Sequence, residues 1–263
     1  MILDEIAADT RLRVARAKEK VSMEEMRVRA LNMDGLTEFP VEQELKREGI
    51  HFICEVKKAS PSKGLIAKEF PYLTIAREYE EAGASVISCL TEPTYFQGSD
   101  QYLEEIAKEV SIPVLRKDFT IDLYQIYEAK VLGAAMVLLI CALLDTETLK
   151  EYIGVCDKLG LSALVETHDE SEMQSALKAG ARIIGVNNRN LKDFTVDIHN
   201  STRLRALAPS DVIFIAESGI KTPDDIQVLR EAKVNGVLIG ETLMRSSNKK
   251  QMLDSLRKVP NTY

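Results

Sequence analysis

Residues 55–64 read Glu-Val-Lys-Lys-Ala-Ser-Pro-Ser-Lys-Gly, directly after a short apolar run at residues 51–54. The run is short and rich in aromatic and β-branched side chains, so it predicts a buried strand. Side chains alternate along a strand, which places Glu55 and Lys57 on one face. The following Ser-Pro-Ser-Lys-Gly cannot continue the strand and predicts a tight loop rich in hydrogen-bond donors. One acid–base pair at a strand end is most simply a solvated salt bridge, but similar arrangements recur along the chain.

The apolar run is the first of a series. Short apolar runs lie near residues 51–57, 85–90, 112–117, 136–140, 162–166, 183–187, 212–216 and 236–239. Segments with helical periodicity lie between them, and several end in a glycine typical of a helix C-terminus. Strands that are apolar on both faces indicate a parallel sheet covered by helices. Eight such units predict an α/β fold, the closed (β/α)8 TIM barrel. An open doubly wound sheet is the alternative, weakened because no GxGxxG follows the first strand.

Residues 2–47 precede the first strand. Apolar residues spaced through residues 2–20 predict an amphipathic helix, and a second helical stretch follows from about Ser22. Residues 32–40 are typical of a linker, and residues 41–47 are polar. The sequence therefore predicts an extra N-terminal helical segment ahead of the barrel.

The composition excludes several classes of protein. The chain has 263 residues, a net charge of −7 and no basic block, which argues against a nucleic-acid-binding surface. No apolar run approaches the roughly 20 residues that span a bilayer, and the N-terminus lacks a signal-peptide core. The four cysteines have no CxxC spacing and the three histidines are scattered, so we expect a cytoplasmic location and no metal site.

Polar residues gather where the predicted strands end, which is where a barrel builds its active site. The strand ends supply Glu55, Lys57 and Ser60, then Lys117, Glu166, Asn187 and Arg189, and finally Glu217, Ser218, Gly219, Gly240 and Glu241. Any one of these residues could be a cap or a solvated charge. Acids and bases that converge on one mouth shift one another's pKa values, as proton-transfer catalysis requires. We therefore expect an enzyme that uses no metal.

The last two strand ends carry a second signal. Glu-Ser-Gly-Ile at residues 217–220 and Ile-Gly-Glu-Thr at residues 239–242 bring backbone N–H groups close to an anion. Barrels commonly bind phosphate after their seventh and eighth strands, and Ser60 lies beside the eighth strand once the barrel closes. The alternative explanation is that these glycines only form turns and do not bind phosphate.

The strand-end segments, taken in their order along the chain, resemble those of the indole-3-glycerol-phosphate synthase family, and the resemblance covers nearly the whole chain. The matching segments are residues 55–64, 90–92, 95–99, 114–119, 164–168, 185–191, 217–220 and 240–245. The resemblance implies a closed barrel at residues 48–263, with residues 1–47 as a helical extension over its mouth, in a single domain overall. It also implies a lyase of tryptophan biosynthesis that needs no cofactor.

The family's substrate is 1-(2-carboxyphenylamino)-1-deoxyribulose 5-phosphate, which undergoes ring closure and then loses CO2 and water. Lys117 suits the general acid that polarises the carbonyl, and by resemblance Glu166 is the base that serves dehydration. Lys57 can bind the substrate's carboxylate or phosphate while it holds Glu55. Glu55, Asn187 and Glu217 would orient the lysines and the substrate.

The remaining candidates would bind the substrate. Arg189 suits the carboxylate, and Phe96, Phe119, Leu138 and Pro61 suit the aromatic ring. Phosphate would contact Ser60 and the backbone near Ser218, Gly219, Gly240 and Glu241. Two features depart from some family members. Glu241 stands where they have Ser, so its side chain must point away from the phosphate, and this chain has no Trp to cap the ring from the N-terminal segment.

Three other functions stay open. A Schiff-base aldolase or lyase acting on a phosphorylated ketose would use Lys117 or Lys57 as nucleophile, although Lys57 beside Glu55 should stay protonated. A non-catalytic sugar-phosphate-binding barrel would share the fold. A phosphoribosylanthranilate-type isomerase would leave Glu55, Lys57 and Lys117 unexplained. For partners we expect a small phosphorylated substrate, no nucleic acid, no membrane, and a monomer or weak homodimer.

Overall fold

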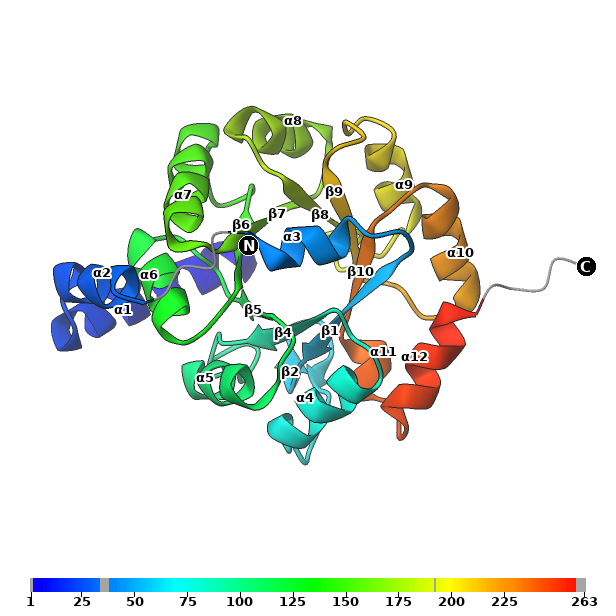
Figure 1. The fold of residues 1–263 in the computed structure, drawn as a ribbon, viewed down its shortest axis with the longest axis horizontal. Helices are drawn as coiled ribbons and strands as arrows, with labels where there is room; N and C mark the ends of the chain where they lie inside the picture. The colour runs from blue at the N-terminus through cyan, green and yellow to red at the C-terminus, as the bar shows by residue number, and fades with distance from the viewer. Residues whose placement is uncertain (1, 34–37, 192, 259–263) are drawn as a thin grey trace, which may run out of the picture.

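Eight parallel strands close into a barrel in the computed structural model, which describes residues 2–33, 38–191 and 193–258. Around the barrel the strands follow the order β1-β10-β9-β8-β7-β6-β5-β4, and helices surround them (Figure 1). The strands are β1 (His51–Val56), β4 (Val86–Leu90), β5 (Val114–Lys117), β6 (Met136–Ile140), β7 (Ser162–Thr167), β8 (Ile183–Asn187), β9 (Ile213–Glu217) and β10 (Gly236–Ile239). The predicted TIM barrel is confirmed.

The helices alternate with the strands as the periodicity predicts. They are α4 (Tyr72–Glu81), α5 (Asp100–Glu109), α6 (Leu123–Val131), α7 (Thr146–Leu159), α8 (Glu170–Ala179), α9 (His199–Arg205), α10 (Pro223–Glu231) and α12 (Lys249–Arg257). Local sequence explains their ends: Asp145 caps the first turn of α7, and Gly160 ends the helix in a left-handed conformation. Three short elements lie outside the predicted pattern, namely β2 (Ala59–Ser60), β3 (Gly64–Leu65) and α11 (Glu241–Met244).

The barrel interior is closed at its N-terminal end by α3 (Pro40–Leu45). Val41 and Leu45 of this helix are both 0% exposed and join the core formed by the inward side chains of the strands. Glu42 accepts hydrogen bonds from Arg182, just before β8, at 2.9–3.0 Å. Figure 1 shows α3 across the middle of the barrel. Residues 40–45 therefore do not lie over the mouth, contrary to the expectation for the segment 1–47, because their apolar side chains fill the opposite end.

The two preceding helices lie beside the barrel and at its C-terminal end. Helices α1 (Ile2–Lys20) and α2 (Met23–Leu31) pack next to α6, where Val14, Met26 and Tyr124 form a small apolar core (Figure 1). The start of α1 reaches the C-terminal ends of the strands, where Ile2, Leu3 and Ile6 line the same cavity as Lys117. The N-terminal segment thus contributes to both ends of the barrel.

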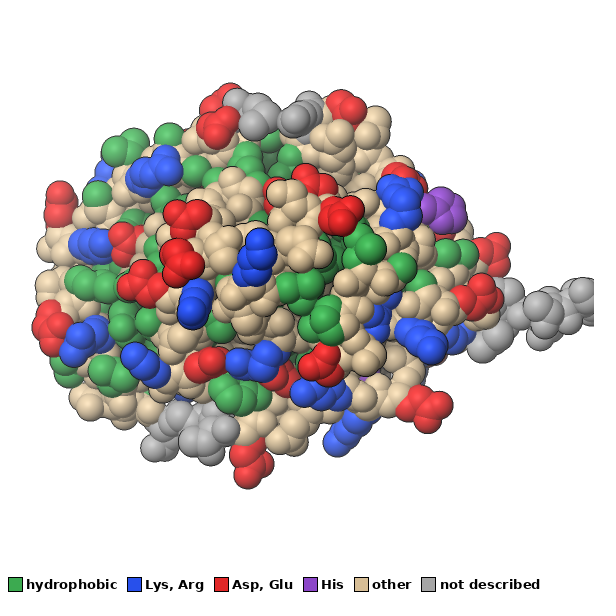
Figure 2. Space-filling model, turned by 90° about the horizontal axis from the view of Figure 1, so that it is seen from above, with side chains coloured by type: hydrophobic (Ala, Val, Ile, Leu, Met, Phe, Trp, Pro, Cys, Tyr) green, Lys and Arg blue, Asp and Glu red, His purple; other side chains and the backbone are tan. Residues whose placement is uncertain are grey.

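Acidic and basic side chains are interspersed on the face drawn in Figure 2 rather than gathered in a region of one sign. A basic stripe of the kind that binds nucleic acids is not seen on this face. Among the described residues, no helix combines the length and apolarity needed to cross a bilayer.

Leu45→Ala tests the contribution of α3 to stability. Because Leu45 is fully buried, we expect the substitution to lower the free energy of unfolding by about 2–5 kcal/mol, as for other buried leucines. Urea unfolding would measure the change. Leu12→Ala is the matched control, since Leu12 is 58% exposed and its loss should change stability by less than about 0.5 kcal/mol. Equal effects in the two variants would contradict the role given to α3.

Candidate active site

The predicted site residues come together in two adjoining cavities at the C-terminal ends of the strands. The first cavity is lined by Glu55, Lys57, Ser60, Pro61, Phe96, Lys117, Phe119, Leu138, Glu166, Asn187, Arg189, Glu217 and Ser218. The second shares five of these, Glu55, Lys57, Ser60, Arg189 and Ser218, and adds Gly219, Gly240 and Glu241. Every residue proposed from the sequence therefore lines one cavity or both.

Lys117, at the end of β5, is the centre of the polar group. Its ammonium nitrogen lies 3.1 Å from Glu166 Oε2 and 3.5 Å from Glu217 Oε2. Gly185 lies on β8, between the strands that carry Glu166 and Glu217. It leaves room for the Glu217 side chain, since a Cβ at this position would lie 2.2 Å from Glu217 Oε1. The barrel register pairs Asn187 with Glu217, so neighbouring strands present their polar ends at one level. One ammonium is thus shared by two buried carboxylates.

The pKa values of Lys117, Glu166 and Glu217 are shifted in different ways by their surroundings. Burial would lower the pKa of Lys117, but the charges of Glu166, Glu217 and Glu55 outweigh burial and raise it, so the ammonium stays protonated. Burial likewise opposes ionisation of Glu166, but Lys117 and His168 lower its pKa to about 2. Burial and the neighbouring carboxylates raise the pKa of Glu217 to about 8, against the pull of Lys117. Carboxyls whose pKa values are pushed apart are suited to distinct acid and base roles.

A second acid–base pair lies on β1 and the residues that follow it. Lys57 Nζ lies 3.1 Å from Glu55 Oε1, and Ser88 Oγ donates to Glu55 Oε2 at 3.5 Å. The Lys57 ammonium also lies 5.6 Å from the centre of the Phe96 ring, within the range of a cation–π contact. The pair therefore joins the charged part of the cavity to its aromatic part.

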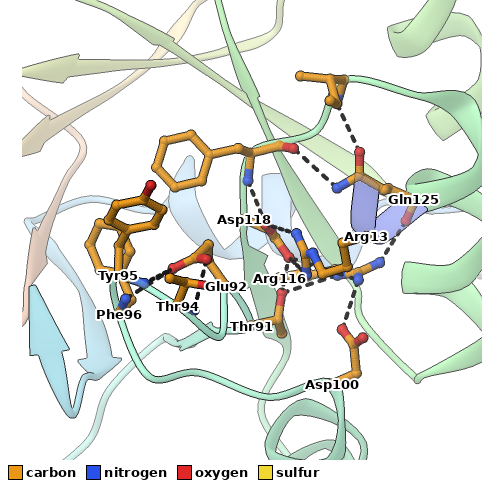
Figure 3. Close-up of polar contacts among 12 residues, drawn as sticks. Arg13, Thr91, Glu92, Thr94, Tyr95, Phe96, Asp100, Arg116, Asp118 and Gln125 are labelled. Carbon is orange, nitrogen blue, oxygen red and sulfur yellow. Dashed lines mark hydrogen bonds and ion pairs between the residues drawn. The ribbon is translucent and has the colours of Figure 1, made fainter. Parts of the chain in front are cut away.

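The apolar side of the cavity is built from two phenylalanines whose ring centres lie 5.9 Å apart, Phe96 and Phe119. The loop that carries Phe96 is held by the buried carboxylate of Glu92, which accepts the backbone N–H groups of Thr94, Tyr95 and Phe96 at 2.7–3.0 Å (Figure 3). Leu138 lines the same cavity. This apolar wall, whose two rings are tilted by 41° to one another, can hold an aromatic ring.

The second cavity has the features of an anion site. Ser218 and Gly219 both have positive φ values, 67° and 83°, and a Cβ at Gly219 would lie 2.3 Å from Val196 Cγ1, so the close approach requires glycine. The carboxylate of Glu241 lies 3.1 Å from Arg245 Nε and 3.8 Å from Lys63 Nζ. These two cations offset the negative charge that Glu241 brings to this cavity.

Helix α1 is tied to the active-site mouth by an ion pair that the sequence did not predict. Arg13 donates to both carboxylate oxygens of Asp118 at 2.6 and 2.8 Å, and Figure 3 shows that Thr91 and Arg116 adjoin this pair. Buried Arg116 in turn contacts Asp100 at 2.7 Å. Asp118 is the residue after Lys117, so the tether of α1 is continuous with the polar centre of the site.

Several residues that line the first cavity were missed by sequence reasoning. Ile2, Leu3 and Ile6 come from α1, and Leu191 and Phe194 come from the loop after β8. Helical periodicity marks the α1 residues as one apolar face, but no local signal shows what that face contacts. Within the described ranges, no group of three His, Cys, Asp or Glu side chains is arranged to hold a metal ion.

A closed (β/α)8 barrel with lysines and glutamates at its C-terminal mouth and an adjoining anion cavity defines a barrel enzyme of the acid–base class. Residues 3–256 match the family model described as indole-3-glycerol phosphate synthase. The chain is 60% identical over 257 residues to the indole-3-glycerol phosphate synthase of Ruminiclostridium cellulolyticum, covering 98% of this chain and 99% of that protein. A protein of the same name from Lachnoclostridium phytofermentans is 53% identical over 268 residues, with 98% and 99% covered. This chain belongs to the indole-3-glycerol phosphate synthase family, which confirms the resemblance.

Solved structures with much lower sequence identity share the fold alone. A 3-hexulose-6-phosphate synthase superimposes with a TM-score of 0.64 at 14% identity, covering 79% of this chain and 98% of that chain. The KGPDC protein of Streptococcus mutans gives a TM-score of 0.62 at 13% identity, covering 79% and 95%. The barrel is thus common to proteins whose sequences have diverged widely.

Arg13→Met tests the tether of α1. Removing the guanidinium leaves the buried Asp118 carboxylate short of a partner, so the free energy of unfolding should fall by about 1–3 kcal/mol. Burial would raise the pKa of Asp118, but Arg13 and Arg116 lower it overall. The stabilisation is therefore complete above the ordinary carboxyl pKa of about 3.9 and is lost as pH falls through the lowered value.

Urea unfolding at several pH values would measure this difference. The gap between the native protein and Arg13→Met should stay constant near neutral pH and shrink in acid. Arg11→Met is the matched control, because Arg11 is exposed on the same helix. A gap that does not depend on pH would show that Arg13 stabilises α1 in some way other than by pairing with Asp118.

Proposed function

We propose that this chain is an indole-3-glycerol-phosphate synthase. It would convert 1-(2-carboxyphenylamino)-1-deoxyribulose 5-phosphate to indole-3-glycerol phosphate, CO2 and water, without a cofactor. Membership of the family supports the proposal. The observation that carries it is the Lys117 ammonium, shared by two carboxylates with opposite pKa shifts next to an aromatic wall.

Ring closure is the first step. The aromatic carbon that bears the carboxylate attacks the C2′ carbonyl carbon, and the carbonyl oxygen takes a proton from Lys117, whose raised pKa keeps it protonated until that charge develops. Loss of CO2 returns its electron pair to the ring and restores aromaticity without a base. Folding the flexible ribulose chain over the ring supplies an orientation effect beside the acid catalysis.

Dehydration is the last step and needs a proton removed and a hydroxyl protonated. Glu166 is the base, because its lowered pKa leaves it ionised, and it lies next to Lys117. Lys117 has given its proton to the carbonyl oxygen, so it would regain one from solvent before it protonates the departing hydroxyl. When Lys117 gives up its proton, Glu166 loses its nearest positive charge and its basicity increases. Glu55, Asn187 and Glu217 orient the two lysines and the carboxylate of Glu166.

The substrate's remaining groups match the rest of the two cavities. The anthranilate ring would lie against Phe96, Phe119 and Leu138, with Pro61 over it and with Leu3 and Ile6 of α1 in place of the missing Trp. Arg189 and Lys57 would share the carboxylate. The phosphate would fall to Ser60, Ser218 and the backbone at Gly219, Gly240 and Glu241. Pairing with Arg245 and Lys63 would keep the Glu241 carboxylate from repelling the phosphate.

The other properties follow as proposals. Residues 1–47 would act with residues 48–263 as one domain, because α1 supplies part of the cavity and α3 part of the core. Since one chain supplies all of the proposed site, a monomer or weak homodimer suffices. The protein would be a cytoplasmic enzyme of tryptophan biosynthesis that binds a small phosphorylated substrate. The mixed charge on the face drawn in Figure 2 agrees with the proposal that it binds no nucleic acid.

The Schiff-base alternative is less well supported. An imine-forming lysine needs a lowered pKa, whereas the pKa of Lys117 is raised by three glutamates. Borohydride reduction in the presence of substrate would trap any imine on Lys117 or Lys57 and would favour the aldolase alternative.

Lys117→Ala and Glu166→Gln test the two assigned proton-transfer roles. Each variant should lose at least about 10²–10⁴-fold in kcat, the usual effect of a general acid or base, while circular dichroism shows an intact fold. Indole fluorescence measures turnover directly, and the chain contains no Trp to add background. Lys108→Ala and Glu104→Gln are matched controls, because both side chains are exposed on the outer face of α5, and they should keep normal turnover. Near-normal turnover in either site variant would remove that residue from the mechanism.

The native protein provides the first test of the activity itself. An increase in indole fluorescence on addition of the substrate, without metal or cofactor, would establish the synthase. A flat trace from folded protein that still binds the substrate would instead favour a non-catalytic sugar-phosphate-binding barrel.

A further inference from the structure

His168 lies just beyond the end of β7 and has no role in the mechanism above. Its ring stands between two carboxylates: Nδ1 is 2.9 Å from Glu172 Oε2, and Nε2 is 3.4 Å from Glu166 Oε1. The His168 side chain is only 17% exposed. Glu172 Oε2 also accepts the backbone N–H of His168 at 2.8 Å, which fixes the ring relative to α8.

The two facing carboxylates determine which form of the ring fits. An ionised carboxylate only accepts hydrogen bonds, so both ring nitrogens must carry a proton to satisfy their neighbours, as they do in the imidazolium. Nε2 is buried, and at 3.4 Å from Glu166 Oε1 it forms no hydrogen bond with any of the described residues. Burial would lower the pKa of His168, but the hydrogen bond that its ring donates to Glu172 and the charges of Glu166, Glu172 and Glu217 raise it overall.

We propose that His168 is a positioning residue, held as an imidazolium by Glu172, that anchors Oε1 of Glu166 and leaves Oε2 facing Lys117. The inference rests on the proposed function, because it takes Glu166 as the base. Asn187 donates to the same Oε1 at 3.2 Å, so this oxygen faces an amide donor on one side and the His168 ring, 3.4 Å away, on the other. Oε2 lies 3.1 Å from Lys117 and is the oxygen left to take the substrate's proton.

The imidazolium also supplies a positive charge that does not depend on Lys117. When Lys117 transfers its proton to the substrate, its charge no longer stabilises Glu166. A protonated His168 would then limit the rise in the pKa of Glu166 and keep its carboxylate ionised until Lys117 regains a proton for dehydration. The base would thus stay available through the step in which the acid is neutral.

The surroundings of His168 determine how pH affects this role. The charged and titratable groups near it are Glu166 (β7), Glu172 (α8), Glu217 (β9), Lys117 (β5), Cys141 (after β6), and Asp169, Asp197, Arg189 and Arg203, which line one cavity with it. Because the pKa of His168 is raised, its anchoring effect is complete below the ordinary value of about 6.5. The effect is lost as pH rises through the raised value, which predicts a basic limb in kcat.

Three substitutions separate the two contacts of the ring. In His168→Gln the amide nitrogen replaces Nε2, so a donor toward Glu166 remains but cannot titrate. In His168→Asn the shorter amide replaces Nδ1 and reaches only Glu172. Glu172→Gln removes the charge that holds the imidazolium. His199→Gln is the matched control, because His199 is exposed on α9.

We expect kcat to stay within about tenfold of the native value in His168→Gln, without the basic limb. His168→Asn should lose about 10- to 100-fold in kcat, since misplacing a reacting group by ~1 Å can cost 10²-fold. Glu172→Gln should move the basic limb to lower pH. Imidazole 15N resonances give a readout that needs no activity, and the chain has only three histidines to assign. His168 should titrate above about 6.5, and Glu172→Gln should lower that value.

The proposal is overturned if His168→Asn keeps native kcat and its native pH profile. It is equally overturned if His168 titrates at or below its ordinary value and Glu172→Gln leaves that value unchanged. Failure of the proposed function is distinguishable, because the native protein would then form no indole product at all. In that case the role of His168 in this reaction also fails, while the imidazole titration still decides whether Glu172 holds the ring protonated.

Discussion

The buried ammonium of Lys117 is the interaction on which the site depends. It lies within 3.5 Å of carboxylates from β7 and β9, and the carboxylate of Glu55 on β1 adds to the field around it. Removing charges from water costs several kcal/mol per ion unless partners are held in good geometry. Strands that are distant in sequence must therefore be kept in fixed register, and the closed barrel gathers the ends of β1, β5, β7 and β9 around one cavity.

Stability and chemistry are divided between the two ends of the barrel. At the N-terminal end, Val41 and Leu45 complete an apolar core, and Glu42 pairs with Arg182 at the rim. At the C-terminal end, the same inward direction of side chains presents Glu166 and Glu217 to a cavity. The acids and lysines of the site are thereby gathered at one end, where Lys117 pairs with Glu166 and Glu217.

Alternation along β5 joins the site to its surroundings. Lys117 points into the barrel, whereas Arg116, one residue earlier, is buried on the outer side and contacts Asp100 and Glu128. Asp118 then receives Arg13 from α1 (Figure 3). Three consecutive residues thus connect the centre of the site, the surrounding helices and the N-terminal helix that covers part of the cavity. This continuity explains how a helix outside the barrel can be part of the site.

The sequence by itself determined the elements and most of the polar residues of the site. Strand and helix periods of 2 and 3.6 residues are local properties, so eight apolar runs and the residues at their ends, such as Glu55, Lys117 and Glu166, could be recognised without a structure. The family resemblance rested on the same strand ends. Only the tertiary structure decided that α3 closes the far end, that Leu3 and Ile6 reach the cavity, and that Arg13 pairs with Asp118 across 105 residues. It also separated the pKa values of Glu166 and Glu217. These features depend on distances and burial between segments far apart in the chain, and no local pattern encodes them.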